Sequence, residues 1–296
     1  LTRFVLFLII FIKELSNLSN SDLILFNFFF FIGDIYIFGI LNNYYIYLHM
    51  YTSNLKINNQ ISIWLITMFW IVSIMIIVGG LTRLTDSGLS ITEWQLFSGL
   101  FPPLNQNDWI FYFDLYKEIP EFKLQNYAMT LNEFKVIFWW EWAHRFLGRL
   151  IGISFLIPLI YFSCKVRPIK LLNLYFIFTL ICFQGFVGWY MVKSGLIDRV
   201  DVSHIRLSIH LVIAFLILSL IFWHYLKINK KNNISKKINP LIPFSFLILI
   251  YFQISIGAFV SGMDAGKIYN SWPLMGSTYF PNDNNFYNLF DISAFN

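Results

Sequence analysis

Long apolar segments alternate with polar ones along most of the chain. Their lengths are close to the roughly 20 residues that an α-helix needs to cross a bilayer. Their apolar residues run on continuously, which favours buried or lipid-facing helices over half-exposed strands. We therefore predict an all-α, polytopic membrane protein with spans at 61–80, 136–162, 171–192, 205–226 and 241–261.

The polar segments between the spans set the orientation. The loop at 164–170 holds three basic residues, and the segment 227–237 holds five lysines. Basic loops remain on the cytoplasmic or matrix side of a membrane. The loops 81–135 and 193–206 are therefore expected on the opposite, outer side.

The loop 81–135 is long for a connection between spans, and such length favours a functional loop. It carries four basic and seven acidic residues. We predict short helices at 108–116 and 131–135. Thr130, followed three residues later by Glu133, is typical of a helix N-cap.

Three parts are expected along the chain. Residues 1–60 form an N-terminal extension, either an extra membrane helix, an interfacial helix or poorly ordered chain, because Asp34 interrupts the apolar stretch 23–41. Residues 61–227 form a four-helix bundle. Residues 238–296 hold a fifth span and an outer tail.

Composition agrees with a membrane protein. Hydrophobic residues make up 57% of the chain and charged residues 12%, whereas soluble domains carry about 25% charged residues. The net charge of +5 comes with the basic loops, so it does not indicate a nucleic-acid partner. Cys164 and Cys182 give neither a metal-binding spacing nor a disulfide framework.

The strongest chemical signal is a pair of ionisable residues inside the second span. Glu141 and His144 are three residues apart, so they share one face of a helix. Such groups are costly inside a membrane and usually functional. The alternative is that the segment, with Arg145 and Arg149, lies at the interface and its long side chains reach the water.

A second histidine reaches the same depth from another span. At about 1.5 Å per residue, His144 lies about 12 Å and His210 about 9 Å from the outer ends of their helices. Facing imidazoles in a helix bundle are typical axial ligands of haem. The alternative is two core histidines with hydrogen-bond partners. His224 lies deeper, but the position that would pair with it is Pro158.

The ends of the first and fifth spans align without gaps at an offset of 178 residues (264 − 86). The matched identities are Gly79 with Gly257, Asp86 with Asp264, Gly88 with Gly266, and Trp94 with Trp272. Repeats of this kind are common in membrane folds, so a duplicated four-span unit is predicted. The counterpart of His144 falls beyond Asn296, so we expect a truncated chain or a second polypeptide.

Several longer motifs resemble the haem A synthase family in its mitochondrial and alphaproteobacterial form. They are TRLTDSGLSITEW (82–94), IPEFKLQNYAMTLNEFKVIFWWEWAHRFLGRLIG (119–152), QGFVGWYMVKSGL (184–196), VSHIRLSIHL (202–211) and GAFVSGMDAGKIYNSWPLMG (257–276). The resemblance implies an eight-span protein of two similar four-helix bundles related by a pseudo-twofold axis. This chain would be its N-terminal bundle plus the first span of the second repeat.

The resemblance also implies an activity, the oxidation of the C8 methyl of haem O to the formyl of haem A for cytochrome c oxidase. It makes His144 and His210 the iron ligands of the N-terminal bundle and Glu141 the catalytic glutamate. Haem b is expected on a second histidine pair, in spans that this sequence lacks. The family's bacterial cysteine pair is absent from 81–135.

Arg83, Arg145 and Arg149 are candidates for binding the haem propionates, because guanidinium pairs well with carboxylate. Expected partners are haem O, the membrane, an electron donor, haem O synthase, cytochrome oxidase assembly factors, a second copy of the chain and a separate polypeptide with the second half. The expected location is the mitochondrial inner membrane or a bacterial plasma membrane. Alternative functions are a non-catalytic haem-binding assembly subunit and a b-type electron-transfer cytochrome.

Overall fold

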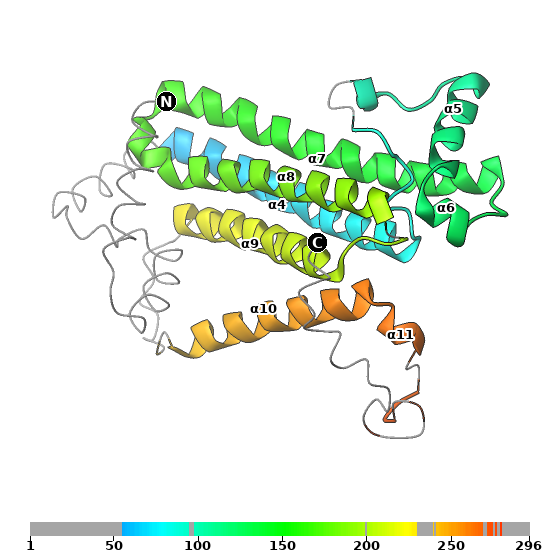
Figure 1. Ribbon diagram of the computed structural model, residues 1–296. Helices are drawn as coiled ribbons and strands as arrows, with labels where there is room; N and C mark the ends of the chain where they lie inside the picture. Colours follow the sequence, from blue (N-terminus) through cyan, green and yellow to red (C-terminus); the bar gives the residue numbers. More distant parts are fainter. Residues whose placement is uncertain are drawn as a thin grey trace, which may run out of the picture. The chain divides into compact units, whose positions relative to one another are not determined.

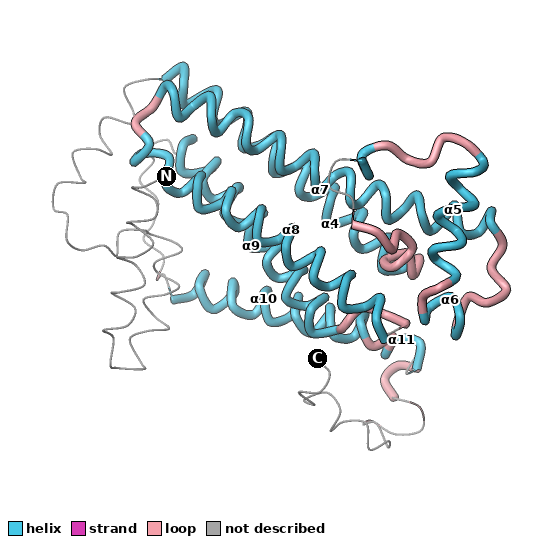
Figure 2. Tube along the Cα trace, turned by 45° about the horizontal axis from the view of Figure 1, so that its top comes forward, coloured by secondary structure: helices cyan, strands magenta, loops and turns pink. Residues whose placement is uncertain are grey.

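The computed structural model describes residues 55–94, 98–198, 200–229, 239, 241–268, 271–274, 276 and 279. Every regular element within these residues is a helix (Figures 1 and 2). The expected all-α class is therefore confirmed for the described chain. The predictions for 1–54 and for 280–296 lie outside the described residues.

Five of the described helices are long and apolar enough to cross a membrane. They are α4 (Leu55–Leu84), α7 (Leu131–Lys165), α8 (Leu172–Asp198), α9 (His204–Asn229) and α10 (Leu241–Gly262). All five predicted spans are confirmed, and the chain is a multi-pass membrane protein. Most of these helices run beyond the predicted ends, because a helix can continue into water after its apolar stretch ends.

The second span shows such an extension at its start. The separate helix predicted at 131–135 is wrong, because these residues are the first turns of α7. Thr130 caps the helix: its hydroxyl accepts a hydrogen bond from Glu133 N, and Glu133 Oε2 accepts one from Thr130 N at 2.7 Å. This capping box stabilises the start of α7. No residue breaks the helix between this cap and the apolar run, so the two segments form one helix.

Shorter helices lie between the spans and after the last of them. They are η2 (Ser98–Leu100), α5 (Gln106–Lys117), α6 (Pro120–Leu124), η3 (Pro168–Leu171) and α11 (Ala265–Ile268). The helix predicted at 108–116 is confirmed as α5. Helix α6 was not predicted, because its five residues make little more than one turn and show no periodic pattern.

Helices α4, α7, α8 and α9 form a four-helix bundle. Helix α8 packs against α7 on one side and α9 on the other. Helix α4 closes the ring: Trp64 Nε1 donates to the main-chain oxygen of Ser154 on α7 at 3.1 Å. On the other side, Asn229 Nδ2 of α9 donates to Ser62 Oγ of α4 at 2.6 Å. Helices α7 and α9 therefore face each other across the bundle core.

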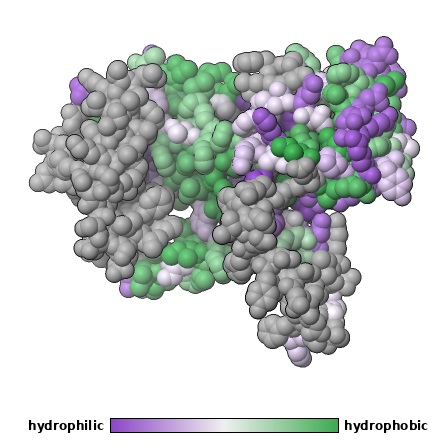
Figure 3. Space-filling model, in the orientation of Figure 1, coloured by the Kyte–Doolittle hydropathy of each residue, from purple (hydrophilic) through white to green (hydrophobic). Residues whose placement is uncertain are grey.

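Helix α10 packs against α9 outside this bundle. Most of its side chains are exposed, and Ala258 is the buried one. In Figure 3 the surface over the long helices is largely hydrophobic, and hydrophilic residues gather over α5 and α6. This distribution is the one expected of helices that face lipid and a polar segment that faces water.

The turns that follow α4 and α10 share an unusual backbone conformation. Asp86 has φ 47° and Asp264 has φ 51°, both in the left-handed region that non-glycine residues rarely adopt. Arg83 joins the two turns, with Nη1 2.7 Å from Asp86 Oδ1 and Nη2 3.2 Å from Asp264 Oδ1. Its Nη2 also donates to the main-chain oxygen of Ser261 at 2.9 Å. The matching turns support the internal repeat predicted from the sequence.

Residues 98–130, with α5 and α6, form a small polar subdomain at one end of the bundle, which we call the cap. Helix α5 packs against α7, and α6 packs against α8. The cap buries Glu121, whose side-chain Oε1 accepts hydrogen bonds from Tyr116 OH at 2.9 Å and Asn126 Nδ2 at 3.4 Å. Burial raises the pKa of Glu121 from 4.5 to about 8, and burial also raises that of Tyr116.

We expect the cap to lose stability as the pH rises from about 4.5 to 8, because the folded state then holds a proton that the unfolded chain has released. The slope is at most about 1.4 kcal/mol per pH unit. Glu121→Gln removes the titration, so its thermal unfolding midpoint should depend less on pH between these limits. Glu118→Gln, at a largely exposed glutamate nearby, is the control. A wild-type midpoint that rises or stays constant over this interval would contradict the prediction.

Candidate functional site

The two histidines predicted as haem ligands lie on the helices that face each other across the bundle. His144 is on α7 and His210 is on α9, and the two imidazoles are close enough to interact electrostatically. The main-chain oxygen of His210 accepts a hydrogen bond from Gln184 Nε2 of α8 at 2.9 Å. The structure thus brings together the two residues that the sequence placed at one depth.

Each imidazole lies against a glycine of a neighbouring helix. A Cβ added to Gly79 on α4 would lie 3.1 Å from His144 Nε2, and one added to Gly188 on α8 would lie 3.1 Å from His210 Cε1. These contacts are tighter than ordinary packing, so both positions leave space for a ring that a larger residue would displace. Sequence reasoning did not assign this role, although glycine inside a long helix costs stability and usually has a packing reason.

The pair formed by His144 and His210 fits an iron atom that is already coordinated by a porphyrin. His210 Nδ1 is buried and has no hydrogen-bond partner within the described part of the chain. No group of three or more His, Cys, Asp or Glu that could hold a bare metal ion occurs among the described residues. His144 and His210 would supply the two protein ligands of a haem iron, whose other four ligands come from the macrocycle.

Glu141 is 2% exposed and fully engaged. Its Oε2 accepts hydrogen bonds from Ser90 Oγ and from Ile91 N, both at 2.7 Å. Its Oε1 lies 2.5 Å from Arg145 Nη2, one helical turn further along α7. The carboxylate thus ties α7 to the segment that follows α4. Ser90 was missed at the sequence level, because nothing in its local pattern distinguishes it from other loop serines.

Arg145 has three acceptors. Its Nη2 donates to the main-chain oxygen of Ile91 at 2.7 Å, in addition to Glu141, and its Nη1 donates to that of Glu93 at 3.1 Å. Its guanidinium also lies 5.6 Å from the ring centroid of Trp94. Arg145 therefore holds the 91–94 segment against α7, and its charge is balanced by Glu141.

The three arginines predicted to bind propionates do not converge. Arg83 is held by the acidic turns that follow α4 and α10. Arg145 is paired with Glu141, and Arg149 lies one turn beyond it on α7. Of the three, Arg145 alone lines the pocket described next.

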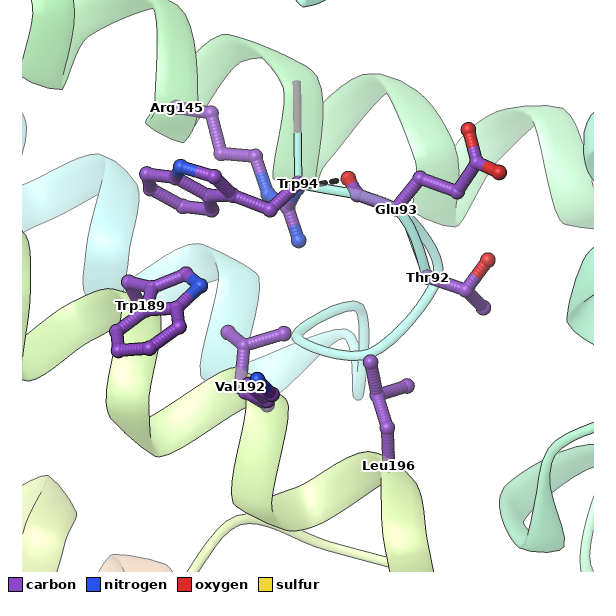
Figure 4. A pocket seen from close by; sticks show the side chains of 8 residues that line it. Thr92, Glu93, Trp94, Arg145, Trp189, Val192 and Leu196 are labelled. Atoms are coloured by element: carbon purple, nitrogen blue, oxygen red, sulfur yellow. Dashed lines mark hydrogen bonds between the residues drawn. The ribbon is translucent and has the colours of Figure 1, made fainter. Parts of the chain in front are cut away.

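A pocket of about 210 Å³ lies between the 92–94 segment, α7 and α8 (Figure 4). Arg145 and two tryptophans lie around it in that view. Its lining residues are Thr92, Glu93, Trp94, Arg145, Trp189, Val192, Lys193 and Leu196. The sequence predicted no role for Trp189 or Lys193, because their proximity to Arg145 depends on how α7 and α8 pack.

Comparison with known proteins places these features in one family. The family model described as "Cytochrome oxidase assembly protein" (COX15-CtaA) matches residues 62–295. The chain is 54% identical over 240 residues to the heme A synthase of Pelagibacter ubique, covering 80% of this chain and 71% of the relative. It is 47% identical over 227 residues to that of Parvibaculum lavamentivorans, covering 76% and 66%.

A third relative, the heme A synthase of Rickettsia bellii, is 46% identical over 225 residues, which cover 74% of this chain and 67% of the relative. The chain thus spans about two thirds of the length of these relatives. No solved structure matches it.

Proposed function

Because the chain belongs to the haem A synthase family and its relatives support that enzymatic function, we propose that its bundle binds haem O between His144 and His210. In this proposal α7 and α9 each supply one axial imidazole. The C8 methyl group of haem O is then held for oxidation to the formyl group of haem A.

One observation carries the proposal: two imidazoles from α7 and α9 lie close enough to interact inside an apolar bundle, each beside a glycine that leaves room for its ring. A second imidazole sets His210 apart from His224, the other buried histidine of α9. His144 lies close enough to His210 to interact with it, whereas the position on α7 that would pair with His224 is Pro158. A haem bound here supplies the iron chemistry, and the chain supplies binding, orientation and exclusion of water.

Glu141 is the proposed proton acceptor at the methyl group. It lies three residues before His144, so both side chains leave α7 on one face. Arg145, Ser90 and Ile91 hold the carboxylate in place through contacts of 2.5 to 2.7 Å. A base whose position is fixed by its neighbours loses little entropy when it reacts. Conversion of a methyl to a formyl group breaks two C–H bonds, and a carboxylate beside the carbon can accept a proton that leaves it.

The remaining assignments extend the proposal. By resemblance, a haem b on a second histidine pair, supplied by a further bundle or a separate chain, would carry electrons between the haem O site and an electron donor. Haem O synthase and cytochrome oxidase assembly factors are the proposed partners, and self-association is expected. The bacterial relatives favour a plasma membrane over the mitochondrial inner membrane.

A haem-binding subunit without catalysis is the second candidate function. It is favoured because the Glu141 carboxylate already has a full set of hydrogen-bond partners.

Two glycine variants on α8 test the proposed haem site. In Gly188→Ala the new Cβ must displace the His210 ring, and overpacking of this kind costs about 1–3 kcal/mol. We expect haem affinity to fall about tenfold or more, measured by Soret titration of the purified chain in detergent. Gly185→Ala is the control, since a Cβ there meets no atom within 4 Å. Equal affinities in the two variants would place the haem elsewhere.

A further inference from the structure

The pocket beside Arg145 combines flat aromatic walls with positive charge. Lys193 Nζ lies 5.2 Å from the ring centroid of Trp189, and the Arg145 guanidinium lies 5.6 Å from that of Trp94. Figure 4 shows both indoles beside the cavity. Aromatic faces next to cations suit a ligand that is flat and anionic.

The pocket lies one helical turn from the histidine pair. Val192 is four residues after Gly188, which lies against His210, so it is about 6 Å further along α8 toward the cap. On α7, Arg145 directly follows His144. A macrocycle with one imidazole on each of its two faces would therefore direct one edge toward this pocket.

The pocket is large enough for the substituents of a ligand but small for a whole drug-sized molecule. Its volume is about 210 Å³, whereas cavities that take an entire drug-sized molecule measure about 300–1,000 Å³. The macrocycle itself would occupy the bundle core. The carboxyethyl arms at its polar edge would reach past Trp189 toward the cap.

Two cationic side chains, Arg145 and Lys193, line the pocket, and Lys193 is the one available to bind an anion. The charge of Arg145 is balanced by Glu141 at 2.5 Å. Lys193 has no carboxylate partner among the described residues, and its contact there is the Trp189 ring. Glu93 also lines the pocket, but its carboxylate points away from the cavity in Figure 4. An incoming carboxylate would therefore meet an ammonium group that no carboxylate of the described residues neutralises.

We propose that Lys193 binds a propionate carboxylate of the haem substrate in this pocket. It thereby fixes which edge of the macrocycle faces the cap and which methyl group reaches Glu141. The inference rests on the proposed haem site between His144 and His210. It replaces the arginines as the main propionate partner and makes Lys193 a specificity-determining residue.

The test uses two probes that differ in their carboxylates alone, iron protoporphyrin IX and its dimethyl ester. Each is titrated into the whole purified chain, and the Soret band reports affinity. Lys193→Gln should bind the free acid about tenfold more weakly than wild type and bind the ester equally well. Lys193→Arg should keep most of the wild-type affinity for the free acid. Lys135→Gln is the control, because that lysine lies near Trp109 at the start of α7.

The outcomes separate this inference from the haem site itself. If Lys193→Gln binds the free acid as tightly as wild type, with a normal bis-imidazole spectrum, the propionate assignment is wrong and the haem site stands. If affinity for the ester falls equally, Lys193 acts on packing and the assignment is also wrong. If wild type gives no bis-imidazole spectrum with either probe, both the haem site and the inference fail.

Discussion

Alanine in place of either His144 or His210 should abolish the low-spin haem signal of the purified chain. Each substitution removes one axial imidazole, and no other described histidine lies beside the pair to replace it. Loss of groups that merely support a metal ligand costs about 10–100-fold in affinity, so loss of a ligand should cost at least about a hundredfold. Absorption and electron paramagnetic resonance spectra after haem loading give the measurement.

His224→Ala is the matched control for these variants. This histidine is on the same helix as His210, is partly buried, and has a ring nitrogen without a partner in the described structure. Its candidate partner position on α7 is Pro158, which cannot bind iron. The His224→Ala variant should bind haem as tightly as the wild type. Equal binding by all three alanine variants would refute the assignment of the pair.

The second large effect is expected at Glu141. Glu141→Gln leaves the Arg145 charge without its partner in a buried setting, and breaking such a pair costs about 3–5 kcal/mol. The variant should therefore unfold at a lower temperature, and it should not convert haem O to haem A under conditions in which the wild type does. Thermal unfolding and product analysis by chromatography measure the two effects separately.

A double variant separates positioning from proton transfer. Glu141→Gln combined with Arg145→Gln removes both charges, so much of the lost stability should return. If Glu141 accepts the proton, activity stays absent in the double variant. Recovery of haem A formation would show that Glu141 serves to hold Arg145 and the 91–94 segment, and its catalytic assignment would be withdrawn.

The spans were predictable because a bilayer imposes a length on apolar runs. The depth of His144 and His210 followed from counting residues along two helices that both start on the outer side. Helix boundaries were harder to predict from the sequence. The cap before Leu131, where α7 starts, is compatible with either a short or a long helix. The short helix α6 is too brief for periodicity to reveal.

The contacts within the site depend on which helix faces meet, and spacing does not determine this. The sequence allowed Arg145 to face solvent, the propionates or Glu141, and the structure pairs it with Glu141. The sequence likewise contains Gly79 and Gly188, but their roles follow from the neighbours that α4 and α8 find in the bundle. Lys193 reaches the same pocket as Arg145 because α8 packs against α7.

The central claim is that one haem is held between His144 and His210. Near-infrared magnetic circular dichroism of the ferric, haem-loaded wild-type chain tests it most directly, because the charge-transfer band reports the two axial ligands. We predict one haem per chain with a low-spin, bis-imidazole band. A high-spin spectrum, or a low-spin band from any other ligand pair, would contradict the claim.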